Sequence, residues 1–158
     1  MSSLCKVVVC SVCLAVLAAA PMASAQAKLE GAWKLSQWTT AGPGPNYKNP
    51  QPGFIIFTKN HYSIMLISGD KPRPELPDNP TIDPMTTPFS KVWANAGTYE
   101  IKDRLLITHP LASNIPRQPE YFAAFLIAFE GPTLSLTQLA DGDGPMSHPM
   151  ILKFVRAK

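Results

Sequence analysis

Hydrophobic and polar residues alternate along most of the chain in short runs, and each run predicts a β-strand. The first run, 29–39, places Trp33, Leu35 and Gln37 on one face. Seven more strand-like runs follow, at 54–58, 62–67, 92–101, 105–109, 121–129, 134–138 and 150–156. After residue 25 no apolar period of 3.6 residues lasts ten residues, so the sequence predicts eight strands and almost no helix.

Two kinds of connection separate these strands. Tight turns are predicted at Lys59-Asn60, Lys102-Asp103 and 130–132, because Asn, Asp and Gly tolerate the backbone angles that such turns need. Three longer segments are rich in proline, which cannot donate a ladder hydrogen bond, and are expected to be loops: 41–53, 69–90 and 110–119. The segment 69–90 is either a binding loop or a surface insertion.

Alternation assigns side chains to an inner face of the predicted sheet. On the strand 92–101 the inner residues are Trp93, Asn95, Gly97, Tyr99 and Ile101. Pairing across the Lys102-Asp103 turn continues this face with Leu105, Ile107 and His109 and sets Gly97 opposite His109. The strand 134–138 alternates in the same way, with Leu134, Leu136 and Gln138 facing in.

Counting outward from the turns places three polar side chains at similar heights inside the sheet: His109, Gln138 and Asn95. An apolar interior with a few convergent polar groups is typical of a small-molecule site. We expect Trp93, Tyr99 and Phe125 to add aromatic contacts to a ligand there. A histidine that is simply satisfied by a neighbouring amide or carbonyl is the alternative reading of His109.

A tryptophan on the first strand and an arginine on the last suggest a sheet closed on itself. The planar guanidinium of Arg156 over the indole of Trp33 would be worth about 0.5–2 kcal/mol and would plug one end. Eight strands close into a barrel that is filled by side chains or holds one small ligand. The predicted fold is therefore all-β, an eight-stranded antiparallel up-and-down barrel.

Residues 1–25 have the pattern of a cleavable signal peptide, and residues 26–158 form the barrel domain. An apolar run, 7–20, precedes a small-residue cleavage site that ends at Ala25. The run is short for a membrane span, which disfavours a retained anchor. All three cysteines lie in this segment, so the mature chain is expected to be periplasmic or secreted and free of disulfides.

Composition argues against several classes of partner and cofactor. The formal net charge is only +3 and no basic stripe occurs, so nucleic acid is not expected as a partner. No later stretch is apolar enough to cross a membrane. The three histidines are scattered, so no zinc site or other cofactor is predicted. Asp141 and Asp143 faintly resemble a calcium loop, but the later carboxylate ligand is missing, and we interpret the segment as a turn.

Several segments together resemble the bacterial lipocalin-like domain family of small exported barrels. The matching pieces are Leu29-Glu30-Gly31-Ala32-Trp33-Lys34-Leu35, Phe54-Ile55-Ile56-Phe57-Thr58, Asn95-Ala96-Gly97-Thr98-Tyr99-Glu100-Ile101, Leu134-Ser135-Leu136-Thr137 and Leu152-Lys153-Phe154-Val155-Arg156. The resemblance implies an up-and-down barrel with a cup for an apolar molecule. It also implies that Gly31, Trp33 and Arg156 seal the closed end and that His109 holds a position where relatives often carry histidine.

Three functions are compatible with these observations. The first, which we favour, is a secreted or periplasmic binding protein for a small hydrophobic molecule. The second is an isomerase or cyclase that uses His109 as acid and base on an apolar substrate in the barrel. The third is a non-catalytic envelope protein whose barrel is packed solid.

Overall fold

The computed structural model describes residues 26–158 except 74, 76–77, 79–88 and 117–119. The expected signal peptide and much of the proline-rich segment 69–90 lie outside the described residues. A single helical turn at 26–29 precedes the first strand. Within the described ranges, no helix is long and apolar enough to cross a bilayer.

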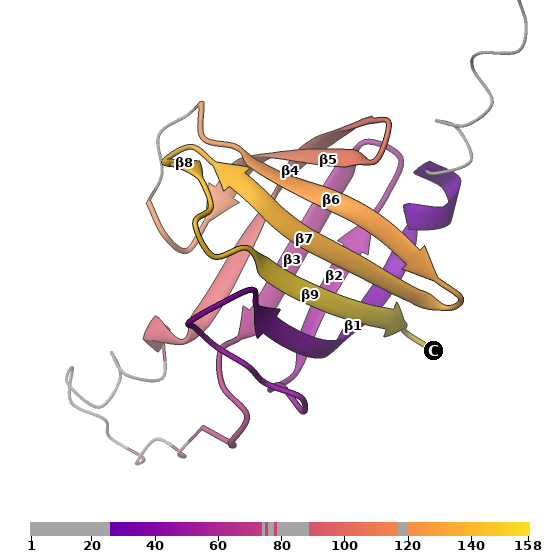
Figure 1. Cartoon of the computed structure of the whole chain (residues 1–158). Coiled ribbons are helices and arrows are strands. Elements are labelled where there is room, and N and C mark those ends of the chain that lie inside the picture. The colour runs from indigo at the N-terminus through magenta and orange to yellow at the C-terminus, as the bar shows by residue number, and fades with distance from the viewer. Residues whose placement is uncertain (1–25, 74, 76–77, 79–88, 117–119) are drawn as a thin grey trace, which may run out of the picture.

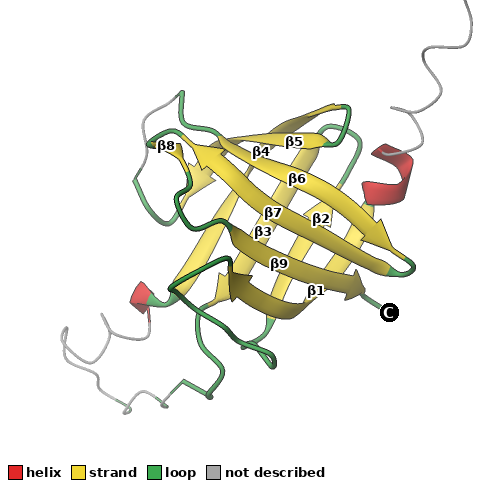
Figure 2. Cartoon of the chain, in the orientation of Figure 1, coloured by secondary structure: helices red, strands yellow, loops and turns green. Residues whose placement is uncertain are grey.

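Nine antiparallel strands make up the sheet (Figures 1 and 2). Their bounds are β1 Gly31–Thr40, β2 Gly53–Phe57, β3 His61–Ile67, β4 Val92–Lys102, β5 Leu105–Ser113, β6 Ala123–Glu130, β7 Thr133–Asp141, β8 Gly144–Pro145 and β9 Met150–Arg156. β8 has two residues and pairs with the end of β7. The other eight strands form the predicted barrel.

The barrel closes because the first strand pairs with the last. β1 lies between β2 and β9, and β6 pairs with β7 as well as with β5, so the order returns to its start. The β1–β9 register sets Trp33 opposite Arg156, and a bulge between Leu35 and Gln37 shifts it. Bulges bend a strand and increase its twist, which helps a sheet curve into a barrel. The all-β, eight-stranded up-and-down prediction is confirmed.

The interior is filled mainly by alternate apolar side chains. In β2, Ile55 and Phe57 are buried while Phe54 and Ile56 are exposed, although the sequence there is apolar on both faces. The largest fully buried side chains come from many strands and from the helical turn: Leu29, Phe57, Leu66, Leu106, Leu134, Leu136, Leu152 and Phe154. A strand whose two faces are both apolar gets its orientation from the register of its neighbours, here β1 and β3.

The observed register of the β4–β5 hairpin differs from the predicted register by one residue. The two turn residues are Asp103 and Arg104, so Lys102 pairs with Leu105 and Ile101 with Leu106. Asp103 has a φ of 58°, which Asp tolerates better than most residues. Because side chains alternate with a period of two, the slip turns the residues of β5 from Leu105 to Pro110 to the other face.

The predicted inward orientation of Leu105, Ile107 and His109 is therefore wrong. Leu106 is fully buried and Thr108 is 4% exposed, so these two side chains face the interior instead. A bulge between Ala96 and Gly97 shifts the register again further along β5. Beyond this bulge Asn95 pairs with Ser113, and Ser113 again faces the interior of the barrel.

Candidate functional site

One end of the barrel is closed by side chains from its two terminal strands. The Trp33 Nε1–H donates to the Leu29 carbonyl at 2.7 Å, which ties the helical turn across the end. The Arg156 guanidinium lies 3.9 Å from the Trp33 ring centroid and donates to the carbonyls of Glu30 and Lys28. Gly31 has a φ of 116°, and a Cβ there would collide with that guanidinium. The structure thus brings together the three residues predicted at the closed end.

Tyr99 also belongs to this end rather than to a ligand site. Its ring packs edge-on against Phe57 at 5.3 Å between centroids, and its hydroxyl donates to the Thr58 carbonyl at 2.7 Å. Burial raises the pKa of the Tyr99 hydroxyl, and the negative charge of Glu30 adds to that shift. The side chain is therefore a neutral hydrogen-bond donor that braces the base.

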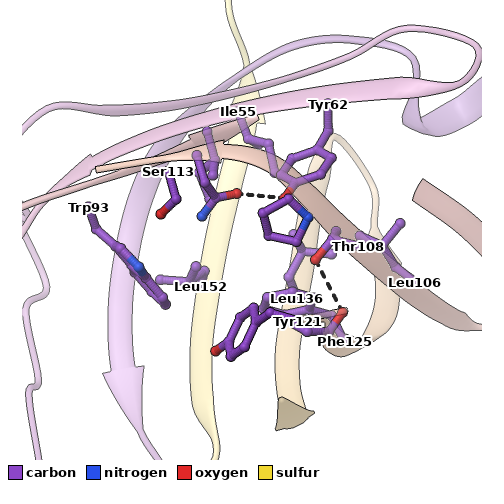
Figure 3. Close-up of a pocket in the computed structure, with 14 residues that line it drawn as sticks. Ile55, Tyr62, Trp93, Leu106, Thr108, Ser113, Tyr121, Phe125, Leu136 and Leu152 are labelled. Carbon is purple, nitrogen blue, oxygen red and sulfur yellow. Dashed lines mark hydrogen bonds between the residues drawn. The ribbon is translucent and has the colours of Figure 1, made fainter. Parts of the chain in front are cut away.

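A cavity of about 40 Å³ lies in the other half of the barrel (Figure 3). Since one buried water needs roughly 10–15 Å³, the cavity is large enough to admit water. Its wall is mainly apolar and draws on seven of the eight barrel strands and on the segment before β6: Ile55, Tyr62, Ile64, Trp93, Asn95, Leu106, Thr108, Pro110, Ser113, Tyr121, Ala123, Phe125, Leu136 and Leu152. Among these described lining residues none carries a charge.

A hydrogen-bonded group of three polar side chains interrupts the apolar wall. The Tyr62 hydroxyl donates to Asn95 Oδ1 at 2.6 Å, and the dashed line that ends at Tyr62 in Figure 3 marks this bond. Burial raises the pKa of Tyr62 to about 12, although the neighbouring Thr108 hydroxyl opposes the shift. The Thr108 hydroxyl donates to the Ala123 carbonyl at 3.2 Å. The phenol therefore stays neutral, and the group offers hydrogen bonds without charge.

A second polar group lies behind the cavity wall. The Tyr121 hydroxyl donates to Asp141 Oδ2 at 2.9 Å, and the Gln138 amide donates to the same oxygen at 3.3 Å. Oδ1 of Asp141 accepts the backbone N–H of Asp143 at 3.0 Å. The carboxylate is thus held by three donors, and one of them, Tyr121, lines the cavity.

Aromatic rings stack beside the cavity. The Trp93 ring lies 6.2 Å from that of Trp38 with 28° between the planes, and Tyr47 meets Trp38 edge-on at 6.0 Å. Tyr47 reaches this position because its backbone exchanges two hydrogen bonds with Trp38. Trp93 and Tyr121 are only partly buried, so both rings border the cavity without being sealed inside the barrel.

The structure brings three of the six predicted ligand-contact residues to the cavity: Trp93, Asn95 and Phe125. Gln138 faces inward and is only 3% exposed, but it bonds to Asp141 and does not line the cavity. The predicted trio of His109, Gln138 and Asn95 therefore does not converge on one point.

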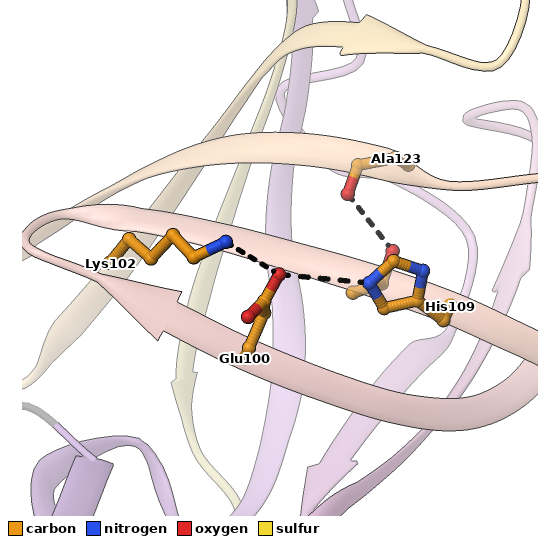
Figure 4. Close-up of polar contacts among 5 residues, drawn as sticks. Glu100, Lys102, His109 and Ala123 are labelled. Atoms are coloured by element: carbon orange, nitrogen blue, oxygen red, sulfur yellow. Dashed lines mark hydrogen bonds and ion pairs between the residues drawn. The ribbon is translucent and has the colours of Figure 1, made fainter.

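His109 lies on the outer surface of the barrel (Figure 4). Its side chain is 47% exposed, and its Nε2 is 3.9 Å from Oε1 of Glu100, which also accepts a 3.0 Å contact from Lys102. The cause is the one-residue register correction in β5. A histidine in this position cannot act on a molecule inside the barrel without unpairing its strand.

Sequence reasoning missed the polar residue at the centre of the site. Tyr62 comes second after the Lys59-Asn60 turn and alternates with Ile64 and Leu66, but Ser63, Met65 and Ile67 form an equally plausible inner face. Thr108 was assigned outward with its strand. Placing the turn at Asp103-Arg104 would have found both residues. That turn sets which side chains of β4 and β5 face inward, and the pairing of β4 with β3 then orients Tyr62.

Comparison with known proteins gives one structural likeness. A lipocalin-like protein from Bacteroides uniformis aligns with 82% of this chain and 99% of its own, at 16% identity and a TM-score of 0.46. No family model matches the sequence, and no curated protein matches it. The closed eight-stranded barrel, established by its own strand pairing, is the architecture that the resemblance to lipocalin-like domains implies.

The described residues hold no cluster of three or more His, Cys, Asp or Glu side chains that could bind a metal ion. The chemistry that the cavity offers is thus apolar contact plus neutral hydrogen bonds from tyrosine, threonine and amide groups.

Proposed function

We propose that the protein binds a small, largely apolar molecule in the cavity, in the half of the barrel away from the closed end. The observation that carries the proposal is the apolar cavity with the Tyr62–Asn95 hydrogen bond in its wall. Ligand sites of this kind are concave, mostly apolar and supplied with a few placed polar groups. A barrel of eight strands is also wide enough to hold one small ligand where side chains do not fill it.

The cavity volume sets a condition on this function. Drug-sized ligands occupy pockets of roughly 300–1,000 Å³, far more than the 40 Å³ found here. A ligand must therefore displace side chains as it enters. Trp93 and Tyr121 line the cavity and are partly exposed, so they are the groups that we expect to move.

The small volume also favours a second candidate, a barrel that is packed solid and serves as a structural or envelope protein. Close packing of this kind needs no ligand for stability. The two functions differ in one measurable property, which is whether the interior admits an apolar probe.

The position of His109 argues against an enzyme that uses this residue as acid and base inside the barrel. That hypothesis needed His109 on the inner face, and its side chain lies outside beside Glu100.

Binding is tested with Nile red, an uncharged dye whose emission shifts when it leaves water. We expect saturable binding to the protein and loss of it in Ala123→Phe, which adds a ring at a cavity-lining position. Ala112→Phe is the matched control, because Ala112 is exposed on the neighbouring strand β5. Thermal unfolding verifies that both variants fold.

Two outcomes decide between the candidates. Dye binding that Ala123→Phe abolishes and Ala112→Phe preserves supports a ligand-binding barrel. Absence of saturable binding, or binding that Ala123→Phe leaves unchanged, contradicts it and leaves the packed barrel as the better description.

We further propose that the chain is exported and works in the periplasm or outside the cell. The support is the apolar run 7–20 followed by Ala23-Ser24-Ala25. Mass spectrometry of fractionated bacteria that express the full chain should find a mature protein that begins at Gln26 outside the cytoplasm. A cytoplasmic protein that retains Met1 would contradict this.

A further inference from the structure

We infer that the cavity selects an uncharged molecule with one hydrogen-bond acceptor oxygen, which receives the Asn95 side-chain N–H, and that it discriminates against carboxylates. The inference rests on the proposed binding function and narrows it to a ligand class. Three observations lead to it: the uncharged wall, the orientation of the Asn95 amide and the carboxylate behind Tyr121.

The wall offers nothing to neutralise an anion. None of the described lining residues is Lys, Arg or His, and the interior around them is apolar. Moving a carboxylate out of water costs several kcal/mol unless a positive charge or a set of donors compensates for it. The same transfer costs far less free energy for an ester, ketone or alcohol, since a single hydrogen bond satisfies its oxygen.

Asn95 supplies that hydrogen bond. Its Oδ1 accepts the Tyr62 hydroxyl at 2.6 Å, which fixes the orientation of the amide and leaves Nδ2 as the donor. In the part of the chain that the structure describes, Nδ2 donates to no acceptor. A donor that borders an apolar cavity and has no protein partner suits a ligand oxygen.

Asp141 adds a negative charge close to the cavity. Its Oδ2 is 2.9 Å from the hydroxyl of Tyr121, a lining residue, so one phenol separates the carboxylate from the cavity. Like charges repel more strongly near a low-dielectric wall than in water. An anionic headgroup near Tyr121 is therefore disfavoured, whereas a neutral one is unaffected.

The test compares three probes of equal chain length by calorimetry at neutral pH: methyl decanoate, decanoate and decane. The ester and the acid differ in charge, and decane lacks the oxygen. We expect the ester to bind at least about tenfold more tightly than decanoate, and several-fold more tightly than decane, because one net hydrogen bond is worth about 1 kcal/mol.

Two substitutions assign the selectivity to the cavity. Asn95→Asp should weaken ester binding about tenfold or more, because it removes the amide N–H and also sets a carboxylate oxygen against the ester oxygen. Asn60→Asp makes the same change at an exposed turn and should have no effect. Ser113→Lys puts a positive charge at a lining position and should strengthen decanoate binding by about tenfold relative to the ester.

The outcomes separate this inference from the proposed function. If decanoate binds as tightly as its methyl ester, the ligand class is wrong while the binding function stands. If the ester binds but Asn95→Asp leaves its affinity unchanged, the role of Asn95 is wrong. If none of the three probes binds, the binding function falls and the inference falls with it.

Discussion

Arg156 joins three parts of the closed end through one side chain. Its planar guanidinium covers the Trp33 ring at 3.9 Å, and its N–H groups reach the carbonyls of Glu30 and Lys28. These carbonyls belong to the segment that leads from the helical turn into β1. Backbone carbonyls need hydrogen-bond donors, and the fork of an arginine can supply two of them at once.

We predict that Arg156→Lys lowers the free energy of unfolding by about 1–3 kcal/mol, because an ammonium lacks the planar fork and the stacking surface. Urea unfolding at neutral pH measures this change in the free energy of unfolding. Arg104→Lys, at the exposed β4–β5 turn, is the matched control and should change the free energy by less than about 0.5 kcal/mol. Equal effects of the two substitutions would show that the stacked geometry adds no stability.

At the scale of single elements, the β4–β5 hairpin decides which side chains meet inside the barrel. The turn places Asp103 at a φ of 58°, a conformation that Asp and Asn reach more easily than β-branched residues. Lys102 then pairs with Leu105, and Thr108 rather than His109 faces Tyr62 and the cavity. The position of this turn therefore decides which side chains of β5 face the site.

Asp103→Val should therefore destabilise the protein by about 1 kcal/mol or more, because a branched Cβ clashes in the left-handed region. Asp103→Gly should be neutral or stabilising, since glycine adopts that φ without a steric cost. Thermal unfolding of the two variants checks both signs. A Val variant as stable as the Gly variant would contradict the turn geometry.

The same hairpin marks how far the sequence alone can lead. Period-two alternation and turn residues predicted eight strands and their order, because each strand must bury one face. Gln138 and Asn95 were placed inward by counting from turns. His109 was misplaced, since a turn that starts one residue later reverses a whole strand. The cavity volume was out of reach, because it depends on how Trp93, Phe125 and Leu136 pack in three dimensions.

At the scale of the whole molecule, closure makes the barrel depend on every strand. β1 pairs with both β2 and β9, so removing either neighbour would leave unpaired backbone groups along it. Tyr62 lies inside this ring, where burial raises the pKa of its hydroxyl from 10 to about 12. The free energy of unfolding therefore depends on pH in the alkaline range, through the hydroxyl of Tyr62.

The sign of that coupling follows from the shift. Unfolding releases Tyr62 to a pKa near 10, so its contribution is fully present below pH 10 and is lost as the pH rises towards 12. We predict a fall in the free energy of unfolding on the order of 2 kcal/mol over that interval, which Tyr62→Phe removes. Tyr99→Phe should retain the Tyr62 part. Urea unfolding as a function of pH measures all three proteins; a Tyr62→Phe profile identical to that of the parent would contradict the coupling.

The stacked indoles of Trp38 and Trp93 give the barrel an optical marker of its own. Two such rings at a centroid distance of 6.2 Å couple their electronic transitions, and the third tryptophan, Trp33, lies apart at the base under Arg156. Coupled transitions produce a paired circular-dichroism band whose size depends on the mutual orientation of the rings. Because Trp93 is in the cavity wall, a molecule that pushes it aside would change that band without any attached label.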